Sequence, residues 1–152
     1  QMKEIISQIC EVKAVYSTKI KASERPKIRC SSDIIKYFRP FFAENMEQKE
    51  LVFMMLLDRG NKILGIVKIG EGSAVGCVID IQYCLRIAIL TNAQAVSVCH
   101  NHPSGELRPS ESDKTICKKL HDAMKLIDIT MIDNLIITES EYYSFADEGL
   151  IY

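Results

Sequence analysis

The sequence predicts one α/β domain in which a sheet lies between helical layers. Short apolar runs that suit buried strands alternate along the chain with segments whose apolar residues recur at helical spacing. A chain of 152 residues fits one domain with a substantial core, so we predict a single domain over residues 1–152. The expected strands are 9–16, 51–58, 62–69, 95–100, 129–138 and 142–145, and the expected helices are 31–42, 81–94 and 110–127.

The strands follow from the spacing of apolar residues. Residues 9–16 alternate between apolar and polar side chains, which is typical of a strand with one buried face. Residues 51–58 (LVFMMLLD) are almost continuously apolar and short, so they fit a strand buried on both faces. The turn signal Gly60-Asn61 makes residues 62–69 the hairpin partner of that strand. A loop or bulge is predicted at the glycines that follow, Gly70, Gly72 and Gly76.

The helices follow from helical spacing and from their end signals. Ser31 or Ser32 is expected to cap the first helix, and Pro40 is expected to end or kink it. Residues 81–94 carry apolar side chains at helical spacing and form the second. The third runs from Ser110 to about residue 127.

Charge is unevenly distributed along the chain. The net charge is -1, but residues 1–40 carry nine Lys/Arg against four Asp/Glu, and the remainder carries ten against sixteen. A basic N-terminal third could contact nucleic acid, although a solvated surface of mixed charge is the favoured interpretation. We therefore expect nucleic-acid binding to be weak if it occurs.

Composition also bears on location and redox state. No apolar run approaches the roughly 20 residues that a membrane span requires, and the N-terminus does not resemble a signal peptide. We therefore predict a cytoplasmic protein with no membrane partner. The six cysteines include no C-x-x-C pair and mostly stand in apolar runs, which favours reduced, buried thiols.

The most informative segment is HNHP at residues 100–103, followed by Ser110 and Asp113 in the pattern H-x-H-x(7)-S-x-x-D. At the end of a strand, His100 and His102 point to the same side of the sheet and can share one metal ion. The Pro-Ser-Gly turn can fold Asp113, in the first turn of the next helix, back toward them. Two nitrogens and one carboxylate leave a fourth position for water, as in a catalytic zinc site.

Each part of this pattern also has a structural interpretation. Ser110 and Asp113 match a capping box, and an isolated H-x-H is weak. The combination favours a metal site, because two of the three histidines in the chain stand here, and Ser110 can cap the helix while its neighbours bind metal. The third, His121, lies about 12 Å beyond Asp113 along the helix axis, too far for a ligand, and is predicted to be a surface residue.

A metal-activated water also needs a general base. Two glutamates are candidates: Glu50 opens the apolar strand, and Glu71 lies in the Gly-rich segment GEGS. Their structural interpretations are a charged residue at a strand start and an exposed loop acid. Periodicity does not decide between them.

The pattern H-x-H-P-x(6)-S-x-x-D resembles the signature of the JAMM (JAB/MPN) metallohydrolases. The segments LLDRGNKILG, CHNHPSGELRPSESD and MIDNLIITESEYYSFADEGL resemble the bacterial RadC family, from about Val12 to the C-terminus. The resemblance implies a JAB/MPN (cytidine deaminase-like) fold, a three-layer sandwich with a mixed β-sheet between helices. It also implies that Zn²⁺ is bound by His100, His102 and Asp113. The Ser110 hydroxyl would stabilise an oxyanion, and the general base would be Glu50 in preference to Glu71.

Two features depart from the family pattern. Full-length RadC proteins usually carry an N-terminal helix-hairpin-helix region that could bind DNA, and we expect none in this chain. Asn134 stands where the family commonly has histidine, but that position is outside the metal motif, so we expect little consequence. The historical label of the family is DNA repair, whereas the motif indicates amide or isopeptide hydrolysis.

The sequence therefore predicts a zinc-dependent hydrolase, a metallopeptidase or isopeptidase that acts on a peptide or protein substrate. One alternative is a DNA-associated protein of DNA repair or of a mobile element, including a nuclease. Another is a zinc-binding module without catalytic activity. A zinc deaminase is not favoured, because its H-x-E and P-C-x-x-C elements are missing.

Overall fold

A single sheet of six strands organises the chain. The computed structural model describes residue 17, residues 19–73 and residues 76–151. The strand order is β3-β2-β1-β4-β5-β6, with β4 and β5 parallel and the other neighbours antiparallel, so the sheet is mixed. The strands are β1 (Leu51–Leu57), β2 (Ile63–Ser73), β3 (Gly76–Ile79), β4 (Ala95–Asn101), β5 (Thr130–Ile137) and β6 (Tyr142–Ser144).

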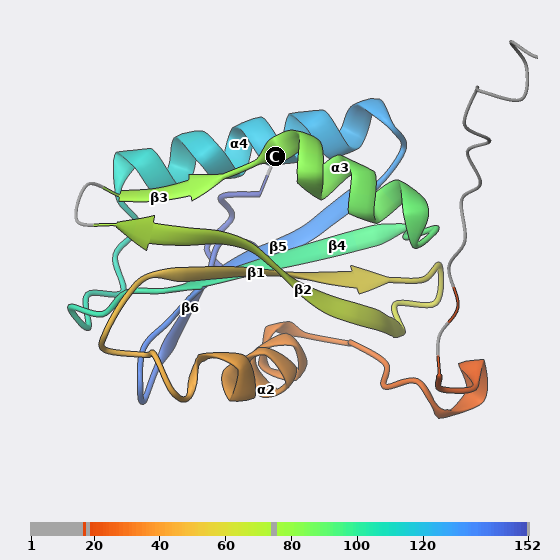
Figure 1. Ribbon diagram of the computed structural model, residues 1–152, viewed down its shortest axis with the longest axis horizontal. Helices are drawn as coiled ribbons and strands as arrows, with labels where there is room; N and C mark the ends of the chain where they lie inside the picture. Colours follow the sequence, from red (N-terminus) through yellow and green to blue (C-terminus); the bar gives the residue numbers. More distant parts are fainter. Residues whose placement is uncertain (1–16, 18, 74–75, 152) are drawn as a thin grey trace, which may run out of the picture.

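Helices cover both faces of the sheet. One face packs against α2 (Ser31–Phe42), and the other carries α3 (Ile81–Leu90) and α4 (Glu111–Leu126) (Figure 1). A short 3₁₀ helix, η1 (Ala22–Glu24), precedes α2. The predicted three-layer α/β sandwich with a mixed sheet is confirmed. Within the described residues, no helix has the length and apolarity that crossing a membrane requires.

Strand β1 separates two apolar cores. All seven of its residues are buried, as the continuous apolar run predicts. Because side chains alternate along a strand, Val52 and Met54 pack in the cluster that includes α3 and α4, whereas Phe53 and Met55 pack in the cluster under α2. A residue's parity on β1 therefore decides which helical layer it meets.

The ends of the helices differ from the predictions in three places. Neither Ser31 nor Ser32 caps α2: Cys30 is the N-cap residue without a side-chain bond, and both serines lie inside the helix. Pro40 does not end α2, which continues for two residues beyond it. Helix α3 ends four residues earlier than predicted, because Asn92 adopts a left-handed conformation with φ 53° just past its C-cap.

Four further predictions concern the glycines, His121, the cysteines and the N-terminal strand. Of the loop or bulge predicted at the glycines, the loop is wrong, since β2 continues to Ser73 and β3 begins at Gly76, but the register of β2 with β1 does shift beside Gly70, as a bulge would make it do. His121 is not a surface residue: its side chain lies on the sheet-facing side of α4 and is 9% exposed. Cys30 is an exposed thiol, whereas the other described free cysteines (Cys84, Cys99 and Cys117) are buried as predicted. The strand predicted at 9–16 lies outside the described residues.

Candidate metal centre

The histidines and Glu50 meet because β1 and β4 are antiparallel neighbours. Val52 stands opposite His100 in their register. Continuing the register by two residues sets Glu50 beside His102, on the same face of the sheet, because the side-chain period of a strand is two. That face is the one covered by α4, since Val52 packs in its core cluster.

Helix α4 supplies the carboxylate through its first turn. Ser110 is the N-cap, and the predicted capping box is present. The Asp113 backbone N–H donates to Ser110 Oγ at 3.1 Å, and the Ser110 N–H donates to Asp113 Oδ2 at 2.7 Å. The cap therefore fixes the Asp113 side chain as well as the helix end, and capping is compatible with a role at the metal centre.

The two imidazoles and the carboxylate converge on one point. His100 Nε2 and His102 Nε2 lie 3.0 Å apart. Asp113 Oδ1 lies 3.4 Å from His100 Nε2, and Asp113 Oδ2 lies 3.4 Å from His102 Nε2. One ligand atom from each of these residues and one from Glu50 all lie within 4.8 Å of one another.

These separations fit a tetrahedral zinc ion. Two bonds of about 2.0–2.1 Å at a tetrahedral angle hold their donor atoms about 3.3 Å apart. The separations among His100, His102 and Asp113 are 3.0 and 3.4 Å, so one ion can reach all three without rearrangement of the chain. Nitrogen and carboxylate donors without thiolate suit Zn²⁺ and related divalent ions.

A backbone carbonyl fixes the ring of His102. Its Nδ1 donates to the Glu106 carbonyl oxygen at 2.6 Å, so in the neutral ring Nε2 carries the lone pair with which His102 can bind a metal ion. Burial lowers the pKa of His102, but the hydrogen bonds with Asp113 and the Glu106 carbonyl, together with the charges of Asp113 and Glu50, raise it above its usual value. The same histidines hold the pKa of Asp113 far below its usual range, although burial opposes this. Asp113 is therefore a carboxylate, the form that binds metal.

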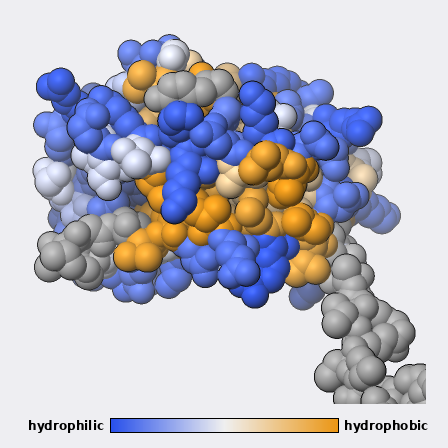
Figure 2. All heavy atoms as spheres, turned by 90° about the horizontal axis from the view of Figure 1, so that it is seen from above, coloured by the Kyte–Doolittle hydropathy of each residue, from blue (hydrophilic) through white to orange (hydrophobic). Residues whose placement is uncertain are grey.

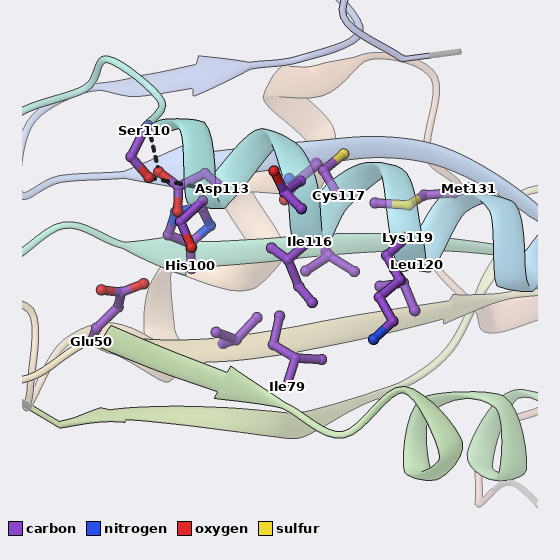
Figure 3. Close-up of a pocket in the computed structure, with 15 residues that line it drawn as sticks. Glu50, Ile79, His100, Ser110, Asp113, Ile116, Cys117, Lys119, Leu120 and Met131 are labelled. Carbon is purple, nitrogen blue, oxygen red and sulfur yellow. Dashed lines mark hydrogen bonds and ion pairs between the residues drawn. The ribbon is translucent and has the colours of Figure 1, made fainter. Parts of the chain in front are cut away.

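The four side chains that could hold a metal ion lie at one end of a cleft of about 530 Å³. Figure 3 shows Glu50, His100 and Asp113 at that end, with Ile116 and Leu120 of α4 continuing along one wall and Ile79 on the other. The face that carries α3 and α4 shows a band of apolar side chains among hydrophilic ones (Figure 2). The cleft therefore joins an ionisable end to an apolar trough.

The two candidate glutamates lie on different faces of the sheet. Glu50 lines the cleft and is one of the four side chains that could hold a metal ion. Glu71 is paired with Leu51 across β1 and β2, and Leu51 packs in the core under α2. Paired residues share a face, so Glu71 is on the α2 face, where it forms an ion pair with Lys49. The structure therefore brings Glu50, and not Glu71, to the two histidines.

The remaining predicted site residue is Ser110, and two residues that the sequence analysis did not assign to the site, Glu106 and Asn134, also contribute to it. Ser110 lines the cleft beside Asp113. Glu106 acts through its backbone carbonyl, which no side-chain pattern can show. Asn134 lines the cleft, and its Oδ1 is buried without a hydrogen-bond partner. Its departure from the family pattern was a signal that could have drawn attention to the cleft floor.

Comparison with known proteins identifies the family. A family model described as RadC-like JAB domain matches residues 28–150. A UPF0758 protein of Flavobacterium johnsoniae is 36% identical over 124 residues, which cover 82% of this chain and 53% of that protein. UPF0758 proteins of Coprothermobacter proteolyticus and Chlorobium chlorochromatii are 35% and 33% identical, over 84% and 82% of this chain and 55% of each protein. The chain belongs to the RadC family of JAB-domain proteins, and it spans about half the length of these curated relatives.

Proposed function

We propose that this protein is a zinc-dependent hydrolase that cleaves amide bonds in peptides or isopeptide-linked proteins. The observation that carries the proposal is the convergence of four side chains at the end of the cleft: Glu50, His100, His102 and Asp113. Two histidines and one carboxylate with an open fourth position form the ligand pattern of catalytic zinc. When bound, zinc polarises the scissile carbonyl and lowers the pKa of a coordinated water toward neutrality.

Glu50 is assigned the role of general base. Its carboxylate lies close enough to the ligand atoms of the other three residues to accept a proton from a water held between them. The same carboxyl can then deliver that proton to the leaving amine. Among the described residues, no Lys or Arg forms an ion pair with Glu50, whereas Glu71 forms ion pairs with Lys49 and Lys68.

Ser110 is assigned to the oxyanion. Its Oγ accepts a hydrogen bond from the Asp113 backbone N–H, which uses one lone pair of the hydroxyl. The residue lines the cleft, and its hydroxyl proton can be donated either to the Asp113 carboxylate, whose pKa that hydrogen bond helps to lower, or to a carbonyl oxygen bound in the cleft. A donor at this position can stabilise negative charge that develops on a carbonyl oxygen held at the same end of the cleft.

The cleft suits a peptide better than a nucleic acid. Its walls are mainly apolar, with Ile79, Ile116 and Leu120 among the lining residues. Among the described lining residues Lys119 is the one Lys or Arg, whereas two carboxylates, Glu50 and Asp113, line the same cleft. Phosphate backbones are bound by several cations. The described basic residues within 19–39, before and within α2, lie away from the cleft, on the side of the sheet that carries α2 (Figure 1).

A screen of peptide and isopeptide libraries with zinc-loaded protein tests this proposal. We expect cleavage that requires zinc and that disappears in Glu50→Gln. Cleavage of DNA with no cleavage of any amide would support the nuclease alternative. Zinc binding without any turnover, with Glu50→Gln indistinguishable from wild type, would support the non-catalytic module.

A further inference from the structure

Asn101 stands between the two histidines and faces the other way. Side chains alternate at a strand end, so His100 and His102 point to the α4 face and Asn101 points to the α2 face. Its side chain is fully buried, at 0% exposure. A buried amide must find hydrogen-bond partners, because a buried polar group left unpaired destabilises the folded protein.

The partners of Asn101 bracket Glu50. The Leu51 backbone N–H donates to Asn101 Oδ1 at 2.7 Å. Asn101 Nδ2 donates to the carbonyl oxygens of Lys49 at 2.9 Å and Met46 at 2.8 Å. The residues immediately before and after Glu50 are therefore both tied to one side chain of β4.

Strand β2 holds Glu50 from its other side. The Gly72 N–H donates to the Glu50 carbonyl oxygen at 2.7 Å. A Cβ atom added to Gly72 would lie 2.8 Å from the Glu50 Cβ, closer than real contacts allow. Glycine at this position is thus required for the close approach of the two backbones, and any larger residue would push Glu50 out of place.

We propose that Asn101 is a positioning residue that fixes the place of the general base, Glu50. Its amide forms a clamp, binding the backbone on both sides of Glu50, and Gly72 holds the Glu50 backbone from β2. The inference rests on the proposed function of Glu50 as base. Through this clamp the motif H-N-H does two tasks, because its outer residues reach the metal position and its central residue fixes the carboxylate that faces it.

Asparagine fits this task for a chemical reason. The site requires one acceptor for a backbone N–H and two donors for backbone carbonyls, and a carboxamide offers both in one plane. Aspartate keeps the acceptor but faces the carbonyls of Lys49 and Met46 with an oxygen. Serine is too short to span the three partners. We therefore expect every substitution of Asn101 to lower the rate of the proposed hydrolysis.

The first test needs neither zinc nor a substrate. In Asn101→Ala we expect amide hydrogen exchange of Leu51 in metal-free protein to accelerate at least about tenfold. A crystal structure should show the Glu50 carboxylate displaced. The matched control is Ser97→Ala, on the same strand and face, where a fully buried hydroxyl loses its bond to the Asp133 carbonyl without touching residues 46–51. An unmoved Glu50 with unchanged Leu51 exchange would overturn the proposal.

The second test asks whether Asn101 acts through Glu50. We expect Asn101→Ala and Gly72→Ala each to lower kcat by about 10- to 100-fold, with zinc affinity within about threefold of wild type. Gly65→Ala is the control for Gly72→Ala, because a Cβ at Gly65 on the same strand meets nothing within 4 Å.

The decisive comparison places each substitution in the Glu50→Gln background, where it should have little further effect on kcat. Full additivity would show that Asn101 acts independently of Glu50 and would overturn the proposal. If wild-type protein cleaves no amide, the proposed hydrolase function fails by itself, and the exchange and crystal structure still decide whether Asn101 sets Glu50. Gly72→Ala keeps the test decisive if Asn101→Ala does not fold, since it displaces Glu50 without removing the clamp.

Discussion

The two faces of the sheet use the same strand ends for different tasks. On the α4 face, His100, His102 and Asp113 crowd their polar atoms within 3.4 Å of one another. On the α2 face, the side chain of Asn101, which stands between the histidines, forms hydrogen bonds with backbone groups of Lys49 and Leu51. The polar groups on the α4 face are thus arranged so that a cation could bind them, whereas the Asn101 amide on the α2 face already has its hydrogen-bond partners within the protein.

The largest effect on kcat should appear when the two candidate glutamates, which lie on different faces of the sheet, are each replaced by glutamine. Glu50→Gln keeps the shape of the side chain and removes its basicity, so zinc binding should survive while kcat falls by a factor on the order of hundreds. Glu71→Gln, on the α2 face, should change kcat only slightly. Steady-state kinetics on a cleaved peptide measures both. A larger loss of kcat in Glu71→Gln than in Glu50→Gln would show that the base lies on the α2 face and that the assignment of Glu50 is wrong.

A second substitution separates metal binding from helix capping at Asp113. Asp113→Asn retains most of the capping ability at the start of α4 but is a poorer metal ligand than a carboxylate. We expect a folded protein whose zinc affinity is lower by about 100-fold or more. Competition titration with a chelating dye measures the affinity, and circular dichroism checks the fold. Unchanged affinity would reduce Asp113 to a capping acid.

The basic residues of the N-terminal third provide a smaller contrast. If the basic residues within 13–39 contact DNA, they do so through phosphates, and affinity should fall steeply with added salt. We expect weak binding without sequence preference, because the net charge is -1. Fluorescence anisotropy at several salt concentrations tests this. Tight, sequence-selective binding at physiological salt would make the DNA-associated alternative the leading one.

The smallest predicted signal concerns thiol reactivity. Burial raises the pKa of the Cys117 thiol to about 11 and that of Cys84 to about 12, so both remain protonated at pH 8. Among the cysteines whose side chains the structure describes, Cys30 is exposed and should react with iodoacetamide before Cys84, Cys99 and Cys117. Mass spectrometry of labelled peptides measures the order. Early labelling of Cys117 would show that the cleft opens more widely than its lining indicates.

Local patterns predicted most of the fold. The seven buried residues of β1 were visible as an apolar run, and the capping box at Ser110 and Asp113 was readable from its spacing. Errors arose where long-range contacts override local signals. The glycines after Gly70 lie in paired strands rather than in a loop, since Gly72 provides a close backbone approach. His121 is buried because the sheet-facing stripe of α4 includes it.

The site divides along the same line. The pair His100 and His102 with Asp113 is local in sequence and could be found from spacing and side-chain chemistry. Glu50 could not be chosen by periodicity, because its place beside His102 depends on the register of β1 with β4. The family resemblance supplied that information. The Asn101 clamp was missed because the pattern H-x-H leaves its central residue unspecified.

The zinc content of the purified protein tests the central claim most directly. Protein prepared without chelators should contain about one zinc per chain by elemental analysis, because three ligands at tetrahedral spacing define one site. His100→Ala should lose the metal, and His121→Gln, which alters the remaining histidine on α4, should keep it. Zinc far below one per chain in the wild type, not restored by added metal, would contradict the account.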